Sequence, residues 1–313
     1  MVADIDLLVL GDANPDLILL GADVVPAFGQ AEHLVDDARL TMGGSGAILA
    51  CGAAKLGLRV AICALIGDDL FGRFVREGLE SAGVDTSGLA VDQQAATGVT
   101  VVLSGPTDRA IITMPGTIAG LRGELIDPSL VERARHVHVS SYYLQTALVP
   151  SLPDVFDIVH DQGATTSIDP NWDPSGLWDT GLLELLQKTD VFLPNSMEAT
   201  RLGHTSDLED AVQSLSTRSD LVVVKNGDRG AIAGSHGKVH HVSGLRALVL
   251  DTTGAGDSFD AGFLAAWLAG EPIERALAIA NACGALSTRA LGGVDAQPTM
   301  DEAVAFLEDG SAA

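Results

Sequence analysis

The sequence predicts an α/β protein: a three-layer core with helices on both faces of a mostly parallel central sheet, and a small β-sheet lid attached to it. From about residue 121 onward, short apolar strands alternate with helical stretches, which is typical of a parallel sheet covered on both faces. Two β-rich segments nearer the amino terminus interrupt this alternation. The 313 residues slightly exceed the roughly 250–300 that usually share one hydrophobic core. We therefore expect one large domain with an appendage.

The β-rich segments define how the chain is divided. We assign residues 1–11, 43–95 and 118–313 to the core, and residues 12–42 and 96–117 to the lid. The two lid segments are far apart in the sequence, and we expect their strands to pair into one sheet.

Changes in hydrophobic periodicity predict the elements of the first half. In the core we expect a strand, a helix, a second strand and a second helix, in that order: Ile5–Leu10, Ala47–Leu56, Arg59–Ile66 and Asp69–Ala82. In the lid, the β-rich runs Thr97–Leu103 and Arg109–Met114 flank Gly-Pro-Thr-Asp at 105–108, which indicates a hairpin.

The second half is predicted from short apolar runs and from helix caps. The expected strands are Val137–Ser140, Thr165–Ile168, Val191–Leu193 and Leu221–Lys225. Asp127 followed by Pro128 is a favoured helix start, because proline lacks an amide that the first turn does not need. Two Ser/Thr-x-x-Glu patterns predict capping boxes: Ser206 with Glu209, and Thr299 with Glu302.

Composition excludes several classes of function. Asp and Glu number 42 against 18 Lys and Arg, so the formal net charge is −24. Nucleic acids and anionic membranes are poor partners for such a chain, because binding to either depends on Lys and Arg. Three cysteines without a CxxC pattern and an amino terminus without basic residues favour a reducing compartment and no signal peptide. We expect a cytoplasmic protein.

The segment 251–257, Asp-Thr-Thr-Gly-Ala-Gly-Asp, is the most informative for chemistry, since a helical stretch follows it. A Gly254-Ala255-Gly256 turn at a helix amino terminus lets backbone amides converge on an anion, aided by the positive end of the helix dipole. Asp257, in the first turn, is then placed to act as a general base. The alternative is that Asp257 only caps the helix.

This segment resembles the carboxyl-terminal signature of the ribokinase-like, PfkB-type carbohydrate kinases, and the resemblance covers essentially the whole chain. It implies ATP-dependent phosphorylation of a hydroxyl on a small sugar or sugar-like substrate, with Asp257 as base and Gly254, Ala255 and Gly256 as an anion hole. It also implies a ribokinase-like fold.

The resemblance extends to residues that bind ligands in the family. For the sugar it implies Asn14, Asp16, Gly43 and Gly44; for the nucleotide it implies Asn195, Lys225, Gly227, Gly230 and Asn281. Asp169-Pro170-Asn171 is similar to a family segment near the phosphates.

Metal ions are also implied by the resemblance. Asn195 and Glu198 match the Asn-x-x-Glu motif that organises Mg²⁺ through water, which agrees with the tendency of Mg²⁺ to keep its water shell. The alternative is a turn followed by a helix-terminal charge. Carbonyl oxygens of Asp251 and Thr253, with the loop 289–293, would hold a monovalent cation such as K⁺.

Three residues need separate treatment. Ile48 stands where the family carries an Asn that binds a sugar hydroxyl, so either it packs into the helix interface or the substrate lacks that hydroxyl. Arg109 in the lid either contacts an anionic group of the substrate or is simply solvated. Tyr142 either stacks on a ligand at the carboxyl edge of the sheet or packs in the core.

We therefore predict an ATP-dependent sugar kinase, with a homodimer formed through an apolar face of the lid. A nucleoside kinase of the same fold is the nearest alternative, which the apolar Ile48 favours. A catalytically weak, sugar-binding relative is the alternative from another class.

Overall fold

The computed structural model describes residues 3–22, 24–26, 28–105 and 109–310. Its larger sheet has nine strands in the order β13-β12-β11-β10-β9-β8-β1-β4-β5. In chain order their bounds are β1 Leu7–Leu10, β4 Val60–Gly67, β5 Asp85–Asp92, β8 His136–Val139, β9 Thr165–Ile168, β10 Val191–Phe192, β11 Leu221–Lys225, β12 Ala231–Ser235 and β13 Lys238–Val242. Every pairing is parallel except β11 with β12 and β12 with β13. The predicted mostly parallel sheet is confirmed.

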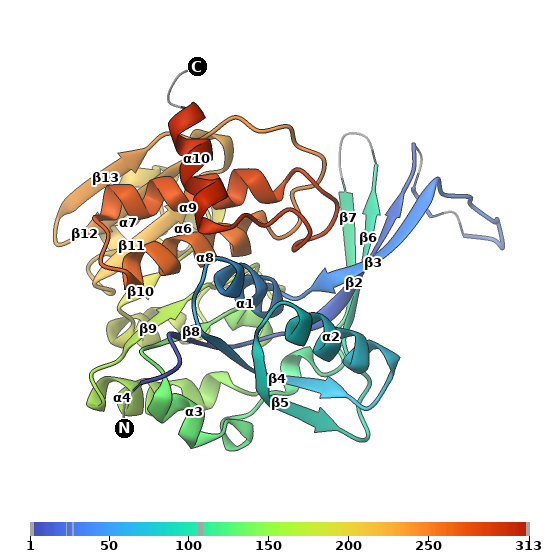
Figure 1. Cartoon of the computed structure of the whole chain (residues 1–313), viewed down its shortest axis with the longest axis horizontal. Helices are drawn as coiled ribbons and strands as arrows, with labels where there is room; N and C mark the ends of the chain where they lie inside the picture. Colours follow the sequence, from blue (N-terminus) through green and yellow to red (C-terminus); the bar gives the residue numbers. More distant parts are fainter. Residues whose placement is uncertain (1–2, 23, 27, 106–108, 311–313) are drawn as a thin grey trace.

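Helices cover both faces of this sheet, as predicted (Figure 1). Successive residues of β1 belong to opposite hydrophobic clusters, with Leu7 and Val9 in one and Leu8 and Leu10 in the other. The first cluster includes α1 Ser45–Lys55, α2 Leu70–Ser81, α8 Ala255–Leu268, α9 Ile273–Ser287 and α10 Met300–Gly310. The second includes α3 Pro128–Arg133, α4 Leu152–Asp161, α5 Leu182–Leu185, α6 Ser196–Leu202 and α7 Leu208–Leu215.

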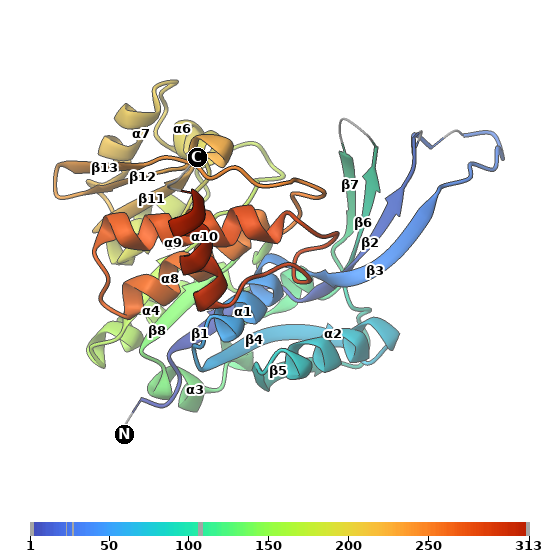
Figure 2. The same ribbon diagram turned by 45° about the horizontal axis from the view of Figure 1, so that its top comes forward.

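A four-stranded sheet projects from one side of the core (Figures 1 and 2). Its order is β3-β2-β6-β7, with bounds β2 Asn14–Leu20, β3 Asp37–Gly43, β6 Val99–Ser104 and β7 Arg109–Met114. β2 pairs with β3 antiparallel and with β6 parallel, and β6 pairs with β7 antiparallel. The two β-rich insertions thus form one sheet, as expected. Within the predicted hairpin turn, residues 106–108 lie outside the described residues.

Local predictions had mixed outcomes. Asp127 accepts a hydrogen bond from the Ser129 amide at the start of α3, as predicted. The capping box at Thr299 is confirmed, because the Glu302 carboxylate accepts from the Thr299 amide at 2.8 Å and the Thr299 hydroxyl accepts from the Glu302 amide at 3.3 Å.

The predicted box of Ser206 with Glu209 is wrong. The helix begins one residue later, and Asp207 caps it by accepting from the Asp210 amide at 3.0 Å. A carboxylate at the N-cap also interacts well with the helix dipole, so the adjacent Asp competes successfully with Ser.

Three strands were not predicted: β5, β12 and β13. The edge strands β5 and β13 mix buried and exposed positions, so their apolar runs are short. Among the described helices, none is long and apolar enough to cross a membrane.

Candidate active site

Polar side chains collect where neighbouring parallel strands end. Asp12 follows β1, Ser141 follows β8, Asp169 follows β9, Asn195 follows β10, and Lys225 is the last residue of β11. Because the carboxyl ends of parallel strands lie at one edge of a sheet, the topology brings these residues together. The start of α8 and the lid sheet complete the site.

The Gly-Ala-Gly turn forms the start of α8. Gly254 occupies the N-cap with φ 71°, in the left-handed region that favours glycine. A Cβ there would lie 2.6 Å from Cα of Gly293, so the close approach of two backbones also requires glycine. Since Gly254 is the N-cap, Asp257 is not at the position that the capping interpretation requires.

Asp257 lies in the first turn of α8, half-buried among other charges. Its pKa is raised to about 7, first by burial and then by the carboxylates of Asp169 and Asp12, against the lowering effects of Lys225 and the Ser45 hydroxyl. A carboxyl group with a pKa near neutrality is well matched to accepting a proton at physiological pH.

Lys225 is buried between two carboxylates. Its Nζ donates to Oδ2 of Asp169 at 2.7 Å and to Oδ2 of Asp260 at 2.8 Å. These carboxylates raise the pKa of Lys225 despite its burial. A Cβ on Gly256 would lie 4.0 Å from Nζ, so the ammonium group lies beside the glycine turn.

Asn195 and Glu198 form a reciprocal capping box at the start of α6. The Asn195 amide donates to Oε2 of Glu198 at 2.8 Å, and the Glu198 amide donates to Oδ1 of Asn195 at 2.9 Å. Glu198 is nevertheless buried, and burial together with the Asp169 charge raises its pKa to about 7. The structural alternative is therefore realised, while the carboxylate still belongs to the charged group around Lys225.

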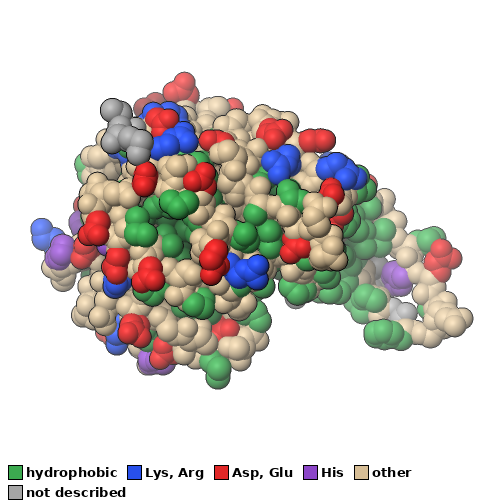
Figure 3. Space-filling view, turned by 90° about the horizontal axis from the view of Figure 1, so that it is seen from below, with side chains coloured by type: hydrophobic (Ala, Val, Ile, Leu, Met, Phe, Trp, Pro, Cys, Tyr) green, Lys and Arg blue, Asp and Glu red, His purple; other side chains and the backbone are tan. Residues whose placement is uncertain are grey.

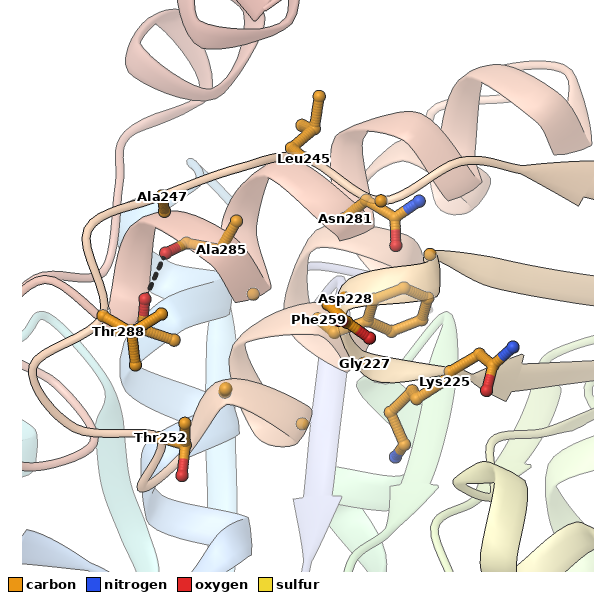
Figure 4. Close-up of a pocket in the computed structure, with 17 residues that line it drawn as sticks. Lys225, Gly227, Asp228, Leu245, Ala247, Thr252, Phe259, Asn281, Ala285 and Thr288 are labelled. Carbon is orange, nitrogen blue, oxygen red and sulfur yellow. Dashed lines mark hydrogen bonds between the residues drawn. The ribbon is translucent and has the colours of Figure 1, made fainter. Parts of the chain in front are cut away.

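A cavity of about 330 Å³ extends from the glycine turn to α9 (Figure 4). Four of the five residues predicted to bind the nucleotide line it: Lys225, Gly227, Gly230 and Asn281. Asn195 is not among the lining residues. Apolar side chains that the sequence did not single out complete the walls: Leu245, Ala247, Val249, Phe259 and Ala285. Leu245, Ala247 and Val249 lie in the loop between β13 and α8, and Phe259 and Ala285 lie within helices. In both places the sequence pattern alone indicates only packing.

The residues predicted to bind the sugar meet at the base of the lid. The side-chain Nδ2 of Asn14 donates to Oδ1 of Asp16 at 3.3 Å. A Cβ on Gly43 would overlap the Asp16 carboxylate, and one on Gly44 would lie 2.9 Å from Oδ1 of Asn14. Burial raises the pKa of Asp16 to about 7, aided by the charges of Asp12 and Asp251.

Arg109 connects the lid to the loop before α8. Its Nη1 donates to Oγ1 of Thr253 at 2.8 Å and to Oδ1 of Asp251 at 3.4 Å. Asp251 also accepts from the amides of Thr253 and Gly292, both at 2.9 Å. The loop 289–293 is thereby held against the segment 251–253, which contains the two carbonyl groups predicted for a monovalent cation.

Ile48 is buried and touches the glycine turn: a Cβ on Gly254 would lie 3.0 Å from its Cγ2. It also packs against Gly293. Tyr142 is only 1% exposed and lies in the second hydrophobic cluster, where its hydroxyl donates to the Thr180 carbonyl at 3.3 Å. The structure thus gives Tyr142 the packing role, with almost no surface available to a ligand.

The donor set suits a divalent cation that keeps its water shell. Four carboxylates, those of Asp169, Glu198, Asp257 and Asp260, interact with the single ammonium group of Lys225. Among the described residues, no group of three or more His, Cys, Asp or Glu has the arrangement of a direct metal site. The excess negative charge fits a cation carried in on phosphate oxygens and contacted through water.

Sequence reasoning missed two groups that shape the site, Asp12 and Asp260, and gave Asn171 only as part of a segment near the phosphates. Asp12 caps α1 by accepting from the Gly46 amide at 3.0 Å. Asn171, with φ 55°, donates to Oγ of Ser141 at 3.1 Å and to Oγ of Ser45 at 3.3 Å. Asp260 lies in the helical stretch that follows the glycine turn, where no motif singles it out. A polar residue within two positions of the end of a predicted strand was the available signal for Asp12 and Ser141.

Known proteins resemble this chain in sequence and in fold. The family model described as "pfkB family carbohydrate kinase" matches residues 4–300. The chain is 33% identical over 302 residues to an ATP-dependent ribose-1-phosphate kinase of Halopiger xanaduensis, covering 96% of this chain and 97% of the relative. It is 32% identical over 275 residues to a fructokinase of Salmonella typhimurium, covering 82% and 88%.

Solved structures with the same fold include a putative ribokinase II from E. coli in complex with ATP and Mg²⁺, with a TM-score of 0.87 and 25% identity over 97% of this chain and 99% of that one. An Arabidopsis thaliana ribokinase complexed with ribose and ATP has a TM-score of 0.85 and 25% identity, over 98% and 99%.

Proposed function

Because this chain belongs to the pfkB family of carbohydrate kinases, we propose that Asp257 and the Gly254–Gly256 turn carry out its ATP-dependent phosphorylation of a sugar hydroxyl. The observation that carries this proposal is the position of Asp257: its carboxyl group, with a pKa of about 7, lies in the first turn of the helix that begins with the glycine turn. The proposed base, Asp257, and the backbone amides proposed to bind the phosphoryl group thus lie in the same helix turn.

In the proposed step, Asp257 takes the proton of the acceptor hydroxyl as its oxygen bonds to the γ-phosphorus of ATP. The bond from that phosphorus to the β,γ-bridging oxygen breaks, and its electron pair leaves with ADP. The amides at Gly254, Ala255 and Gly256 stabilise charge on the transferring group. Such preorganised donors are typically worth about 10²–10³ in rate each.

The adenine and ribose of ATP would occupy the 330 Å³ cavity, with Asn281, Gly227 and Gly230 in contact. Its mostly apolar walls with a few polar groups are typical of small-molecule sites. The acceptor sugar would lie on the other side of the glycine turn, against Asn14, Asp16 and Gly43–Gly44.

Mg²⁺ would be held by Glu198 and Asn195 through water, where it neutralises phosphate charge. Both protein groups are preorganised for this by their capping box. The carbonyl oxygens of Asp251 and Thr253 are the ligands we propose for K⁺, since hard cations favour oxygen.

The test is ADP release across a panel of pentoses, hexoses, keto-deoxy acids and nucleosides, with Mg²⁺ and with or without K⁺. Ribose 1-phosphate belongs in the panel, because the relative from Halopiger xanaduensis is named as a ribose-1-phosphate kinase. In addition, the guanidinium group of Arg109 is a suitable partner for the phosphate of such a substrate. Turnover of at least one sugar is expected. Activity confined to nucleosides would favour the nucleoside kinase, for which the apolar Ile48 beside Gly254 is the specific observation. No turnover on any compound would favour a sugar-binding protein.

A further inference from the structure

The ammonium group of Lys225 lies between two carboxylates and the glycine turn. An ammonium group has three N–H donors. Two of them are taken by Oδ2 of Asp169 and Oδ2 of Asp260, at 2.7 and 2.8 Å. One donor remains, and Nζ lies beside Gly256, where an anion bound by the turn would sit. Figure 4 shows the side chain reaching from the end of β11 toward the first turn of α8.

Asp260 is expected to lower the stability of the fold. It is fully buried on α8, three residues after Asp257, and its Oδ1 has no hydrogen-bond partner among the described residues. A buried carboxylate with an unpaired oxygen is destabilising, and buried ion pairs in general contribute little net stability. An apolar side chain would suit this mostly apolar part of the helix better, so the carboxylate points to a role beyond folding.

The charges of Asp169 and Asp260 keep Lys225 protonated. Both raise its pKa against the opposing effect of burial, Asp169 more than Asp260. Burial also raises the pKa of Asp260 itself, and the ammonium group of Lys225 opposes that rise. Lys225 in turn lowers the pKa of Asp257. The position of this ammonium group therefore affects both the phosphate side and the base side of the site.

We propose that Asp260, acting with Asp169, is a positioning residue that fixes the Lys225 ammonium so that its free N–H stabilises the phosphoryl group during transfer. Lys225 donates a hydrogen bond and exchanges no proton; the bonds that form and break are those given above. This inference rests on the proposed function, since it assigns a role within the same step.

The test compares Asp260→Asn and Lys225→Met with the wild type, using a sugar that the wild type phosphorylates. Loss of the ammonium group should lower kcat by about 10²–10³, as for other preorganised donors. Asp260→Asn keeps the size of the side chain, and we expect kcat to fall about 10-fold with the KM of the sugar unchanged, because the affected interaction strengthens only in the transition state.

Two readouts separate positioning from a structural role. The double variant Lys225→Met/Asp260→Asn should be no slower than Lys225→Met, because Asp260 acts only through Lys225. Lys225→Met should shift the acidic limb of the pH–rate profile to higher pH, whereas Asp260→Asn, which retains the ammonium group, should not. If Asp260→Asn melts below the assay temperature, the double variant carries the comparison, since it removes the buried ammonium group together with one of its two carboxylates.

Asp6→Asn is the matched control, because Asp6 is a buried carboxylate that pairs with Arg59 and Arg135 at the opposite edge of the sheet. It should lower the melting temperature while leaving kcat within twofold of wild type. A kcat for Asp260→Asn equal to that of Asp6→Asn, or a double variant slower than Lys225→Met, would overturn the inference. A wild type without turnover would instead reject the proposed function.

Discussion

At the scale of single residues, the site concentrates carboxyl groups whose pKa values are raised toward neutrality. Asp16, Glu198 and Asp257 each reach about 7, in each case first through burial and then through neighbouring carboxylates. Such clusters of shifted groups are typical of functional sites. A cation bound among them would lower these pKa values, which agrees with the water-mediated role proposed for Mg²⁺.

Asp257→Asn should lower kcat by about 10²–10⁴, the usual contribution of a general base, with ATP affinity nearly unchanged. Because the carboxylate must be ionised to accept a proton, wild-type kcat should rise with pH on the acidic side of about 7, since bound Mg²⁺ lowers the pKa from its cation-free value. Steady-state kinetics from pH 5 to 9 and ATP titration by calorimetry measure the two effects. A variant with near-normal kcat would remove Asp257 from the mechanism.

Asp257→Asn should lower kcat but increase the stability of the fold at neutral and alkaline pH. Burial raises the pKa of Asp257 above its unfolded value of 3.8, so the folded chain holds this proton more tightly. The stability from that proton is present below pH 3.8 and is lost as the pH rises toward 7. Asp257→Asn should therefore raise the melting temperature at pH 8 more than at pH 5; an equal change at both would contradict the shift.

At the scale of elements, the lid and the loop before α8 are joined by one arginine. Arg109 at the start of β7 contacts Thr253 and Asp251, which are adjacent to the glycine turn. The position of the lid sheet and the geometry of the turn are therefore linked through this side chain.

Arg109→Ala should raise the KM of the sugar about 10-fold, equivalent to about 1.4 kcal/mol, because the lid loses its contact with the loop. Arg39→Ala is the control: Arg39 is also in the lid, and its salt bridge is to Asp37 of the same strand. Initial-rate kinetics on both variants make the comparison. Equal effects of the two substitutions would mean that the contact of Arg109 with the loop has no special role.

At the scale of the whole molecule, one face of the lid is apolar and exposed. The strand register aligns Leu40, Leu17, Val101 and Ile112 in a row across the four strands. Leu40 and Ile112 are 41% and 57% exposed. Asp16, Thr41 and Thr100 form the neighbouring row on the opposite face. Figure 3 shows hydrophobic side chains gathered near the lid.

We propose that a second copy of the chain covers the apolar face of the lid. Ile112→Lys should then convert a dimer to a monomer at micromolar concentration, as measured by light scattering. Ile158→Lys, at a residue 50% exposed on α4, is the control and should leave the dimer intact. A wild type that is already monomeric would contradict the proposal.

The net charge of −24 predicts a dependence of stability on salt. Acidic side chains are scattered over the face in Figure 3, so their repulsion acts on the whole fold. The melting temperature should rise as ionic strength increases from about 0.05 to about 1 M, since the screening length falls to about 3 Å. Choline chloride should act like KCl if repulsion is the cause; a rise with K⁺ alone would indicate cation binding instead.

Local patterns predicted much of the fold. Alternating apolar strands and helices predicted the parallel core, and Asp127-Pro128 and Thr299/Glu302 predicted helix starts that the structure contains. Ser206/Glu209 failed because Asp207 is an equally good cap one residue away, and sequence alone does not choose between adjacent caps. The edge strands β5 and β13 were missed because a half-exposed strand has no continuous apolar run.

By itself, the sequence determined the family, the glycine turn and the position of Asp257 in the first turn of its helix, because these depend on contiguous residues. The tertiary structure decided what surrounds them: Asp169 and Asp260 on either side of Lys225, Ile48 against Gly254, and Arg109 on Thr253. Residues that are far apart in the chain come into contact only through the order of the strands and the packing of the helices on the sheet. The charges that shift each pKa are therefore absent from any local pattern.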